Sequence, residues 1–495
     1  MGMKLIPPSQ RSQDRSWPIA EPQSSGFHAE DGAATAKAAP ARRLRSGVAL
    51  LLIAAGGLLA ASLVTACSQL TQTLTVDFVY VLSAKAAGAN QYGEINVYEI
   101  NSESGHMRQI PTSPFPSAGR NPVAEAVSAD YANLFVVNQD DNTIVQFVIG
   151  SDGKLYPFNT VNTPGIFPMA VAANKANLFV VDTYEPLPLC STADPCPGSI
   201  GVFPLSAGGS SSSAPCTATV CIGAPAVNSS VSGSYWPLAL SGANASHVIV
   251  PTAVNVLASG SYVYVTAYDS SVSPSVGYVF GFVVGSGGVL TPLSGSPFAA
   301  GVQPTAIASD PSSTYVYVTD FVKGDVLGYW VVPTRTTSSS PTTLPSGVTC
   351  PPPTPGGTPQ TGTTTDPSGT LCTLANSPFH SGTQPTAIVV DPSYPYAYVT
   401  NSLDATVAAF SMSSGKLTSV GTFSTGLDPV AIGIDPSTNH FLYTVNFLDN
   451  TVSGFELSTT AGTLLDSQGS PFTTDAQPTA VTAIPHNGTG GGIQP

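Results

Sequence analysis

The residues best placed to do chemistry in this chain stand directly before a recurring proline. Seven short apolar segments begin with that proline, and the residue in front of it is polar or aromatic in every case: Asn121, Phe167, Trp236, Gln303, Gln384, Asp428 and Gln477. Side-chain amides donate and accept hydrogen bonds and aromatic rings stack on sugars, so this set suits a neutral polar ligand such as a sugar or glycan. We select as ligand-binding candidates Asn121, Trp236, Gln303, Gln384 and Gln477. The alternative is that they are turn residues dictated by the following proline.

Catalytic candidates are few. Hydrolysis of a lactone needs a group that activates water and a cation or donor that stabilises the oxyanion. Arg120 stands just before Asn121, Asp428 precedes a recurring proline, and His380 follows a repeated "SPF" motif, so these three are weak catalytic candidates. The sequence contains no G-x-S-x-G, no H-E-x-x-H, no phosphate loop and no dinucleotide glycine pattern. The catalytic residues therefore stay unknown, and the alternative for each candidate is a solvated loop residue.

Three Asn-x-x-Asp pairs follow apolar strands: Asn138 with Asp141, Asn401 with Asp404, and Asn446 with Asp449. Calcium prefers several carboxylate and carbonyl oxygens, and two side chains per turn are too few. We therefore predict hairpin turns capped by Asn and Asp, with no metal and no cofactor.

The elements that must position these residues form a repeat. The recurring prolines are Pro122, Pro168, Pro237, Pro304, Pro385, Pro429 and Pro478, and the shortest interval, from Pro385 to Pro429, is 44 residues. Four short strands with their turns fill such a unit. After the proline strand comes a second strand such as "YVYVT" or "AYVTN", a third that closes on an aromatic residue, and a fourth after a glycine hairpin.

The two ends of the repeat region complement one another. Residues 78–115 contain strands two, three and four of a unit but no proline strand, and residues 476–484 are a proline strand alone. Pairing the two closes a ring and removes exposed sheet edges. We therefore predict an all-β fold, a seven-bladed β-propeller with four-stranded blades, in which the C-terminal strand completes the first blade.

The strands "YVYVT" and "AYVTN", set between "QPTAI" and "DATV", resemble the YVTN family of β-propeller repeats. The whole ring, residues 76–485, resembles the wider seven-bladed lactonase-like propellers. Such propellers include sugar-lactone hydrolases of the 6-phosphogluconolactonase type and surface proteins without known chemistry, so the resemblance implies the fold more strongly than an activity. The family's catalytic residues do not map one by one onto this chain.

The N-terminal region is of another kind. Residues 1–41 form a polar leader, and residues 42–66 have the arginines and short apolar run of an export signal. The signal ends in "VTAC", which resembles the lipobox of bacterial lipoproteins and implies lipidation of Cys67. An ordinary cleaved signal and an uncleaved anchor helix are the alternatives. Residues 67–75 would be a tether.

Cysteine usage agrees with export. Beyond Cys67 the chain has six cysteines, and the simplest disulfide pairing is local: Cys190 with Cys196, Cys216 with Cys221, and Cys350 with Cys372. They lie in loop insertions, about 184–227 and 333–375, which we expect the disulfides to hold on the outside of the ring. Residues 486–495 are expected to be a flexible tail.

The charge balance narrows the function classes. A net charge of −14 with a pI near 4.6 argues against nucleic-acid binding and against binding of anionic membrane surfaces. Our first hypothesis is an exported, lipid-anchored binding or scaffolding module at the bacterial cell envelope, not an enzyme, with a neutral polar ligand or an envelope protein as partner. The alternative is a lactonase-like hydrolase with its site at the central channel. A third hypothesis, a structural surface array, predicts self-association; the sequence leaves the oligomeric state open.

Overall fold

The computed structural model describes residues 75–84, 91–101, 103–186, 190, 195–208, 218–335, 341–352, 357–436 and 441–485. The chain divides into Met1–Leu74 and Thr75–Pro495, and every described residue belongs to the second unit. The predicted leader, signal, lipidation site at Cys67 and tail therefore lie outside the described residues. The described part contains no helix with the length and apolar character of a membrane span.

Short strands build seven sheets, the blades, here listed from the central axis outward. Blade 1 contains β37 (Pro478–Pro485), β1 (Thr75–Ser83), β2 (Glu94–Asn101) and β3 (Met107–Gln109), with β4 (Phe115–Pro116) also on β2. Blade 2 contains β5 (Pro122–Val127), β6 (Asn133–Asn138), β7 (Thr143–Ile149) and β8 (Leu155–Asn162). Blade 3 contains β9 (Ile166–Ala173), β10 (Asn177–Tyr184), β11 (Ser199–Ala207) and β12 (Val220–Ile222), with β13 (Trp236–Pro237) also on β11.

The remaining blades follow the same plan. Blade 4 contains β14 (Ile249–Val256), β15 (Tyr262–Asp269), β16 (Val276–Val284) and β17 (Leu290–Pro292), with β18 (Phe298–Ala299) on β16. Blade 5 contains β19 (Pro304–Ser309), β20 (Tyr315–Asp320), β21 (Asp325–Val331), β26 (Leu371–Thr373), β23 (Thr349–Cys350) and β24 (Gln360–Thr361), with β27 (Phe379–His380) on β21. Blade 6 contains β28 (Pro385–Val390), β29 (Tyr396–Asn401), β30 (Thr406–Ser413) and β31 (Lys416–Ser424). Blade 7 contains β32 (Pro429–Ile434), β33 (Phe441–Asn446), β34 (Thr451–Leu457) and β35 (Leu464–Asp466), with β36 (Phe472–Thr473) on β34. A ribbon of β22 (Thr342–Thr343) and β25 (Thr363–Thr364), and two short 3₁₀ helices, η2 (Gly242–Asn244) and η3 (Ser286–Gly288), complete the described elements.

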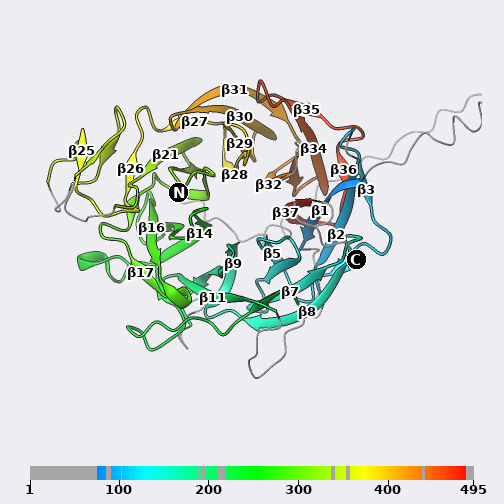
Figure 1. The fold of residues 1–495 in the computed structure, drawn as a ribbon, viewed down its shortest axis with the longest axis horizontal. Helices are drawn as coiled ribbons and strands as arrows, with labels where there is room; N and C mark the ends of the chain where they lie inside the picture. Colours follow the sequence, from blue (N-terminus) through cyan, green and yellow to red (C-terminus); the bar gives the residue numbers. More distant parts are fainter. Residues whose placement is uncertain are drawn as a thin grey trace, which may run out of the picture. The chain divides into compact units, whose positions relative to one another are not determined.

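The blades close into a ring around a central axis (Figure 1). Each inner strand contacts the inner strand of the next blade, and β37 contacts both β32 and β5. Within blade 1, β37 pairs antiparallel with β1 from Asp77 opposite Pro485 to Ser83 opposite Pro478. The predicted seven-bladed propeller, with its first blade completed by the C-terminal strand, is confirmed.

The "YxY" motif of the second strands joins neighbouring blades. The Oη of Tyr317 donates to the carbonyl of Gly415, at 2.8 Å, in the hairpin of the next blade. Gly415 has φ +81°, and a Cβ there would lie 2.5 Å from the ring of Tyr315. The first tyrosine therefore needs a glycine to pack on and the second bonds its carbonyl. Three more tyrosines make the same bond: Tyr80 to Gly153, Tyr264 to Gly369, and Tyr398 to Gly462.

One strand assignment from the sequence is wrong. A register shift follows the proline at the start of every inner strand, and in blade 4 that proline is Pro251, not Pro237. Trp236 instead pairs with Ile200 on the outer side of blade 3, where four other blades place the phenylalanine of their "SPF" motif. Its side chain is 4% exposed, because the indole packs in the apolar core between blades 3 and 4.

Two of the predicted disulfides are present, Cys190–Cys196 and Cys350–Cys372. Cys216 lies outside the described residues, so the pairing of Cys216 with Cys221 stays a prediction. Cys350 and Cys372 belong to β23 and β26, which widen blade 5 on its outer side, and Leu344 and Val348 of this insertion join the core.

Candidate functional site

One end of the ring, which we call the mouth face, carries two kinds of connection. Entry loops lead into the inner strands, and mouth turns join the second strand of each blade to the third. The residue before the anchor proline accepts a backbone hydrogen bond from the mouth turn of its own blade, and five blades show it: Gln139 N to Asn121 O, Phe321 N to Gln303 O, Ser402 N to Gln384 O, Phe447 N to Asp428 O, and Ala84 N to Gln477 O. The repeat therefore fixes one such residue in each of these five blades at the same end of the ring.

Four of the five ligand-binding candidates lie in this set: Asn121, Gln303, Gln384 and Gln477. All four are half-buried. Asn121, Gln384 and Gln477 have φ between 52° and 59°, a left-handed backbone that residues other than glycine seldom adopt. Within the described part of the chain, no hydrogen bond ties down the side-chain amides of the three glutamines, whereas that of Asn121 donates to Gln139 Oε1 and Asp140 Oδ1, at 3.1 and 3.2 Å.

The fifth candidate, Trp236, does not precede an inner strand and is buried on the outer side of blade 3. Val250 takes its place before Pro251 and Phe167 stands before Pro168, so two adjacent blades present apolar residues there. The sequence itself indicates that Pro251 begins the inner strand of blade 4, because "VPTAV" at residues 250–254 matches "QPTAI" more closely than "WPLAL" does.

The side chain of Arg120 forms an ion pair with Asp141 of the same blade. Its Nε and Nη2 reach Asp141 Oδ1 at 2.6 and 2.5 Å, its backbone N–H donates to Asp141 Oδ2, and Nη2 also donates to the carbonyl of Asp140. The hydrogen bond and charge of Asp141 raise the pKa of Arg120 above its usual value. The ion pair leaves this guanidinium little capacity to stabilise an oxyanion, since its charge is already matched.

The aspartates of the Asn-x-x-Asp turns hold the entry loops. Asp404 Oδ2 accepts the N–H of Thr383, and Asp449 Oδ2 accepts the N–H of Leu427, both at 2.6 Å. Together with Asp141 they form the same contact in three blades, so these carboxylates have a structural partner in each turn.

The other two catalytic candidates lie in separate blades. Asp428 is in the entry loop of blade 7, with φ 54°. His380 is on the outer strand β27 of blade 5, where its side chain is 78% exposed and its Nδ1 lies 3.3 Å from Asp325 Oδ1. Blades 2, 5 and 7 do not adjoin, so the structure does not bring Arg120, Asp428 and His380 together.

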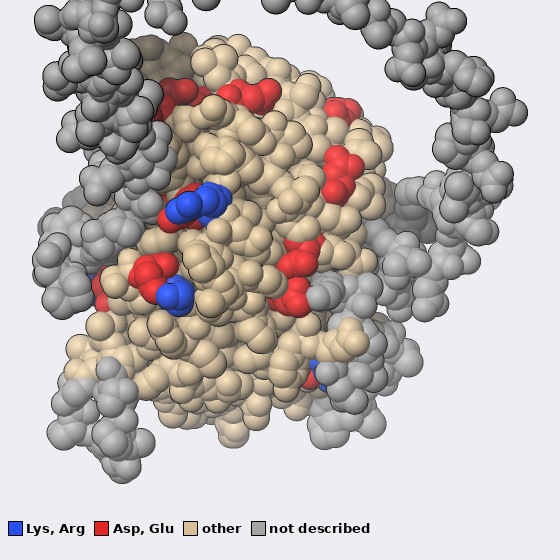
Figure 2. All heavy atoms as spheres, turned by 90° about the vertical axis from the view of Figure 1, so that its right-hand side faces the viewer, with Lys and Arg blue, Asp and Glu red and all other residues tan. Residues whose placement is uncertain are grey.

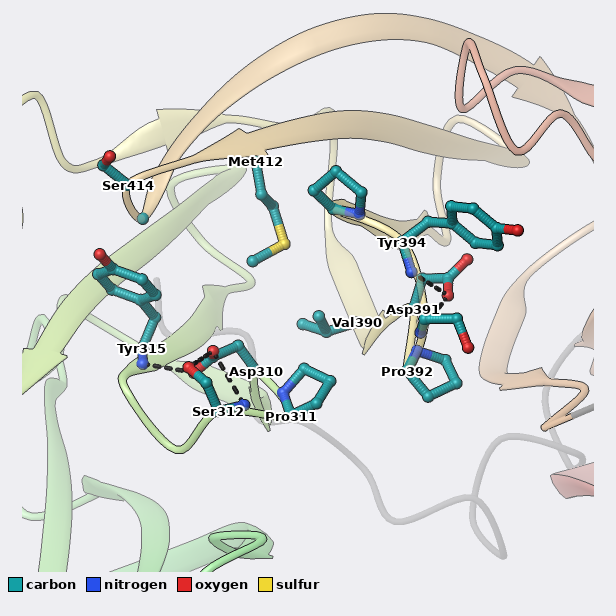
Figure 3. A pocket seen from close by; sticks show the side chains of 13 residues that line it. Asp310, Pro311, Ser312, Tyr315, Val390, Asp391, Pro392, Tyr394, Met412 and Ser414 are labelled. Atoms are coloured by element: carbon teal, nitrogen blue, oxygen red, sulfur yellow. Dashed lines mark hydrogen bonds between the residues drawn. The ribbon is translucent and has the colours of Figure 1, made fainter.

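A cavity of about 300 Å³ lies on the opposite face, between blades 5 and 6 (Figure 3). Two Asp-Pro turns, Tyr315, Tyr394 and Met412 line it. Asp310 accepts the backbone N–H groups of Ser312 and Tyr315, and Asp391 accepts that of Tyr394. Both carboxylates therefore cap their own turns, and the cavity offers mainly ring and proline surfaces.

Two buried carboxyl groups escaped the sequence reasoning. Glu125 on β5 occupies the third position after the proline, where every other inner strand has valine or isoleucine: Val171, Val254, Ile307, Ile388, Ile432 and Val481. Neither of its carboxyl oxygens has a hydrogen-bond partner among the described residues, and burial raises its pKa well above the usual range. Asp182 accepts the N–H of Gly165 at 2.9 Å, and burial raises its pKa to about 7. In an alignment of the seven inner strands, Glu125 is the one charged residue at this position.

Part of the ring resembles a known family of propellers. Residues 358–482 match the family model described as "Lactonase, 7-bladed beta-propeller". No curated protein matches the sequence.

Solved structures agree on the fold. A proposed 6-phosphogluconolactonase from Bacteroides fragilis superposes with a TM-score of 0.57 at 18% identity, over 84% of this chain and 99% of its own. The periplasmic gluconolactonase of Pseudomonas aeruginosa gives 0.55 at 16% identity, over 83% and 99%. At this level of identity the likeness concerns the fold alone. The resemblance to lactonase-like seven-bladed propellers, expected from the repeated motif, is confirmed.

Proposed function

We propose that this lactonase-like propeller binds a neutral, polyhydroxylated ligand of the sugar class at the centre of its mouth face. One observation carries the proposal: Asn121, Gln303, Gln384 and Gln477 occupy equivalent positions in four blades, and the three glutamine amides are not committed within the described residues. Amides bond hydroxyl groups without demanding a charge on the ligand. The net charge of −14 disfavours an anionic ligand, and acidic residues are also more widespread than basic ones on the outer side of the ring seen in Figure 2.

The test is a titration of the purified chain with sugars, sugar lactones and the corresponding sugar acids, followed by calorimetry. Gln303→Ala combined with Gln384→Ala should weaken binding of the best ligand at least about tenfold, which corresponds to about 1.4 kcal/mol. Gln109→Ala, a change of an exposed glutamine on outer strand β3, is the matched control. Equal affinity of the double variant and the wild type would refute the amide site.

Lactone hydrolysis at the same face is the second candidate. The match of residues 358–482 to the lactonase model favours it. Its test is turnover of sugar lactones by the chain with its disulfides intact. Loss of turnover in Arg120→Ala without loss of folding would support a role for that residue, and an unchanged rate would dismiss it.

We also propose that the chain is exported and anchored by lipid at Cys67, as a binding module of the bacterial cell envelope. The disulfides Cys190–Cys196 and Cys350–Cys372 support an oxidising compartment. Mass spectrometry of the mature N-terminus, compared with Cys67→Ser, tests the anchor; an unmodified N-terminus beyond residue 67 would exclude it.

A further inference from the structure

Exposed apolar side chains gather on one side of the mouth face. The second residue of the mouth turn is apolar in three consecutive blades, where Val322, Leu403 and Leu448 are 56%, 65% and 62% exposed. Leu427, in the entry loop of blade 7, is 55% exposed, and Tyr92, beside β2 in blade 1, is 54% exposed. We call these five residues the apolar arc.

Hydrogen bonds link the loops that carry the arc in blades 5, 6 and 7 and reach the start of the mouth turn of blade 1. Hydrogen bonds join each turn to the neighbouring loops along it: Ser381 N to Gly324 O, Thr383 N to Asp404 Oδ2, Thr425 N to Ala405 O, Leu448 N to Leu427 O, Thr474 N to Asn450 O, and Ala84 N to Gln477 O. The turns that carry the exposed residues are thus fixed relative to one another.

The second residue of the mouth turn is polar in two blades on the other side of the mouth face. At the same turn position, blade 2 has Asp140 and blade 4 has an exposed Ser271. Single exposed leucines are normal on a protein surface, but the same turn position exposed and apolar in adjoining blades marks an interaction surface.

The charged residues around the apolar arc indicate the chemistry of the partner that would bind it. Among the described residues of its turns and entry loops are four carboxylates, Asp404, Asp428, Asp449 and Asp475, against one lysine, Lys323. A second copy of this chain would bring two acidic faces together, and an anionic lipid surface would be repelled as well. A partner with basic groups beside apolar ones complements the arc.

We propose that the apolar arc is the docking surface for a polypeptide segment that presents leucine-like side chains interleaved with lysine or arginine. The apolar side chains of the segment cover Val322, Leu403 and Leu448. Its cations lie beside Asp404 and Asp449, which are exposed and next to those leucines.

The experiment uses the whole chain and short fluorescent peptides, with binding read as fluorescence anisotropy. The probe contains leucine and lysine; a leucine–glutamate peptide and a serine–lysine peptide of the same length are its controls. We expect the leucine–lysine peptide to bind, more weakly as salt increases, and the other two to bind at least about tenfold more weakly. The triple variant Val322→Ser, Leu403→Ser, Leu448→Ser should lose at least about tenfold in affinity, because it removes the apolar contact.

The control variant Val227→Ser, Leu465→Ser changes residues that are 63% and 66% exposed away from the mouth face, and should bind like the wild type. Equal affinity of the triple variant and the wild type would overturn the proposal, as would equal binding of the serine–lysine peptide. Sedimentation provides a separate check: a dimer of the wild type that the triple variant cannot form would assign the arc to a second copy and overturn the peptide partner.

Discussion

The tyrosine contacts between blades allow a matched test of how the repeat is held together. Tyr317 and Tyr443 occupy the same place in the second strands of blades 5 and 7, and both are fully buried. Tyr317 Oη donates to Gly415 O at 2.8 Å, whereas Tyr443 Oη is buried with no hydrogen-bond partner among the described residues. The same change, Tyr to Phe, therefore removes a hydrogen bond in one blade and an unsatisfied polar atom in the other.

The expected magnitudes follow from this difference. Tyr317→Phe loses a buried hydrogen bond and leaves the carbonyl of Gly415 without that donor, so it should lower the free energy of unfolding by about 1 to 2 kcal/mol. Tyr443→Phe should leave it unchanged or raise it by up to about 1 kcal/mol, because no bond is lost and a buried hydroxyl is removed.

The assay is urea unfolding followed by tryptophan fluorescence, for which Trp236 and Trp330, 4% and 6% exposed, are buried reporters in the ring. Comparing midpoints at equal slope keeps the two variants on one scale. If both variants shifted the midpoint by the same amount in the same direction, the hydrogen bond to the hairpin glycine would not be what distinguishes the blades.

Three further experiments test buried charge and glycine geometry. Glu125→Val restores the apolar residue that the other inner strands have at this position. Because burial raises the folded-state pKa of Glu125, the wild type loses stability as pH rises above about 4.5. The variant should therefore be more stable than the wild type at about pH 8, and its free energy of unfolding should change less with pH. Burial raises the folded-state pKa of Asp182 from 3.8 to about 7, so its contribution to the free energy of unfolding is present below about pH 4 and lost as pH rises through 7. Asp182→Asn should raise the free energy of unfolding by on the order of 4 kcal/mol at about pH 8 and by little at about pH 4. A stability gain that does not depend on pH would contradict the pKa shift. Gly415→Ala should lower the free energy of unfolding, measured in urea, more than Gly362→Ala does. Both glycines have positive φ, +81° and +79°, but only at Gly415 would a Cβ meet a ring, that of Tyr315, 2.5 Å away. Equal losses of stability would mean that the tyrosine ring moves aside at no cost.

The ring itself could be predicted because its determinants are local. Each inner strand has a proline near its start, the second strands of five blades carry an aromatic–x–tyrosine pair, and a glycine marks the hairpin that the tyrosine contacts, so most units carry the full signature. The complementary ends, residues 78–115 and 476–484, then require closure.

The misassignment of Pro237 shows where local signals fail. Trp236–Pro237 looks like the start of an inner strand, yet it pairs on the outer edge of blade 3, because its large ring fills the site that phenylalanine fills elsewhere. The ion pair of Arg120 with Asp141 was equally hidden, since the two residues are 21 positions apart and meet only when the entry loop folds onto the mouth turn. The unpaired state of Glu125 depends on what the neighbouring blade places beside it, which no local pattern reports.

The amide positions and the apolar arc share loops, and this makes their occupancy interdependent. Gln384 follows Thr383, whose N–H holds the turn that exposes Leu403, and Leu427 adjoins Asp428 in the next entry loop. A polypeptide that covers Leu403 and Leu427 therefore lies over two of the entry loops. We predict that saturating leucine–lysine peptide weakens binding of the sugar-class ligand, and that the ligand weakens peptide binding by the same factor, as linkage requires. In the Val322→Ser, Leu403→Ser, Leu448→Ser variant the ligand should bind as in the wild type and the peptide should have no effect on it. Unchanged ligand affinity at peptide saturation of the wild type would mean that the peptide occupies only the outer margin of the arc and leaves the entry loops free.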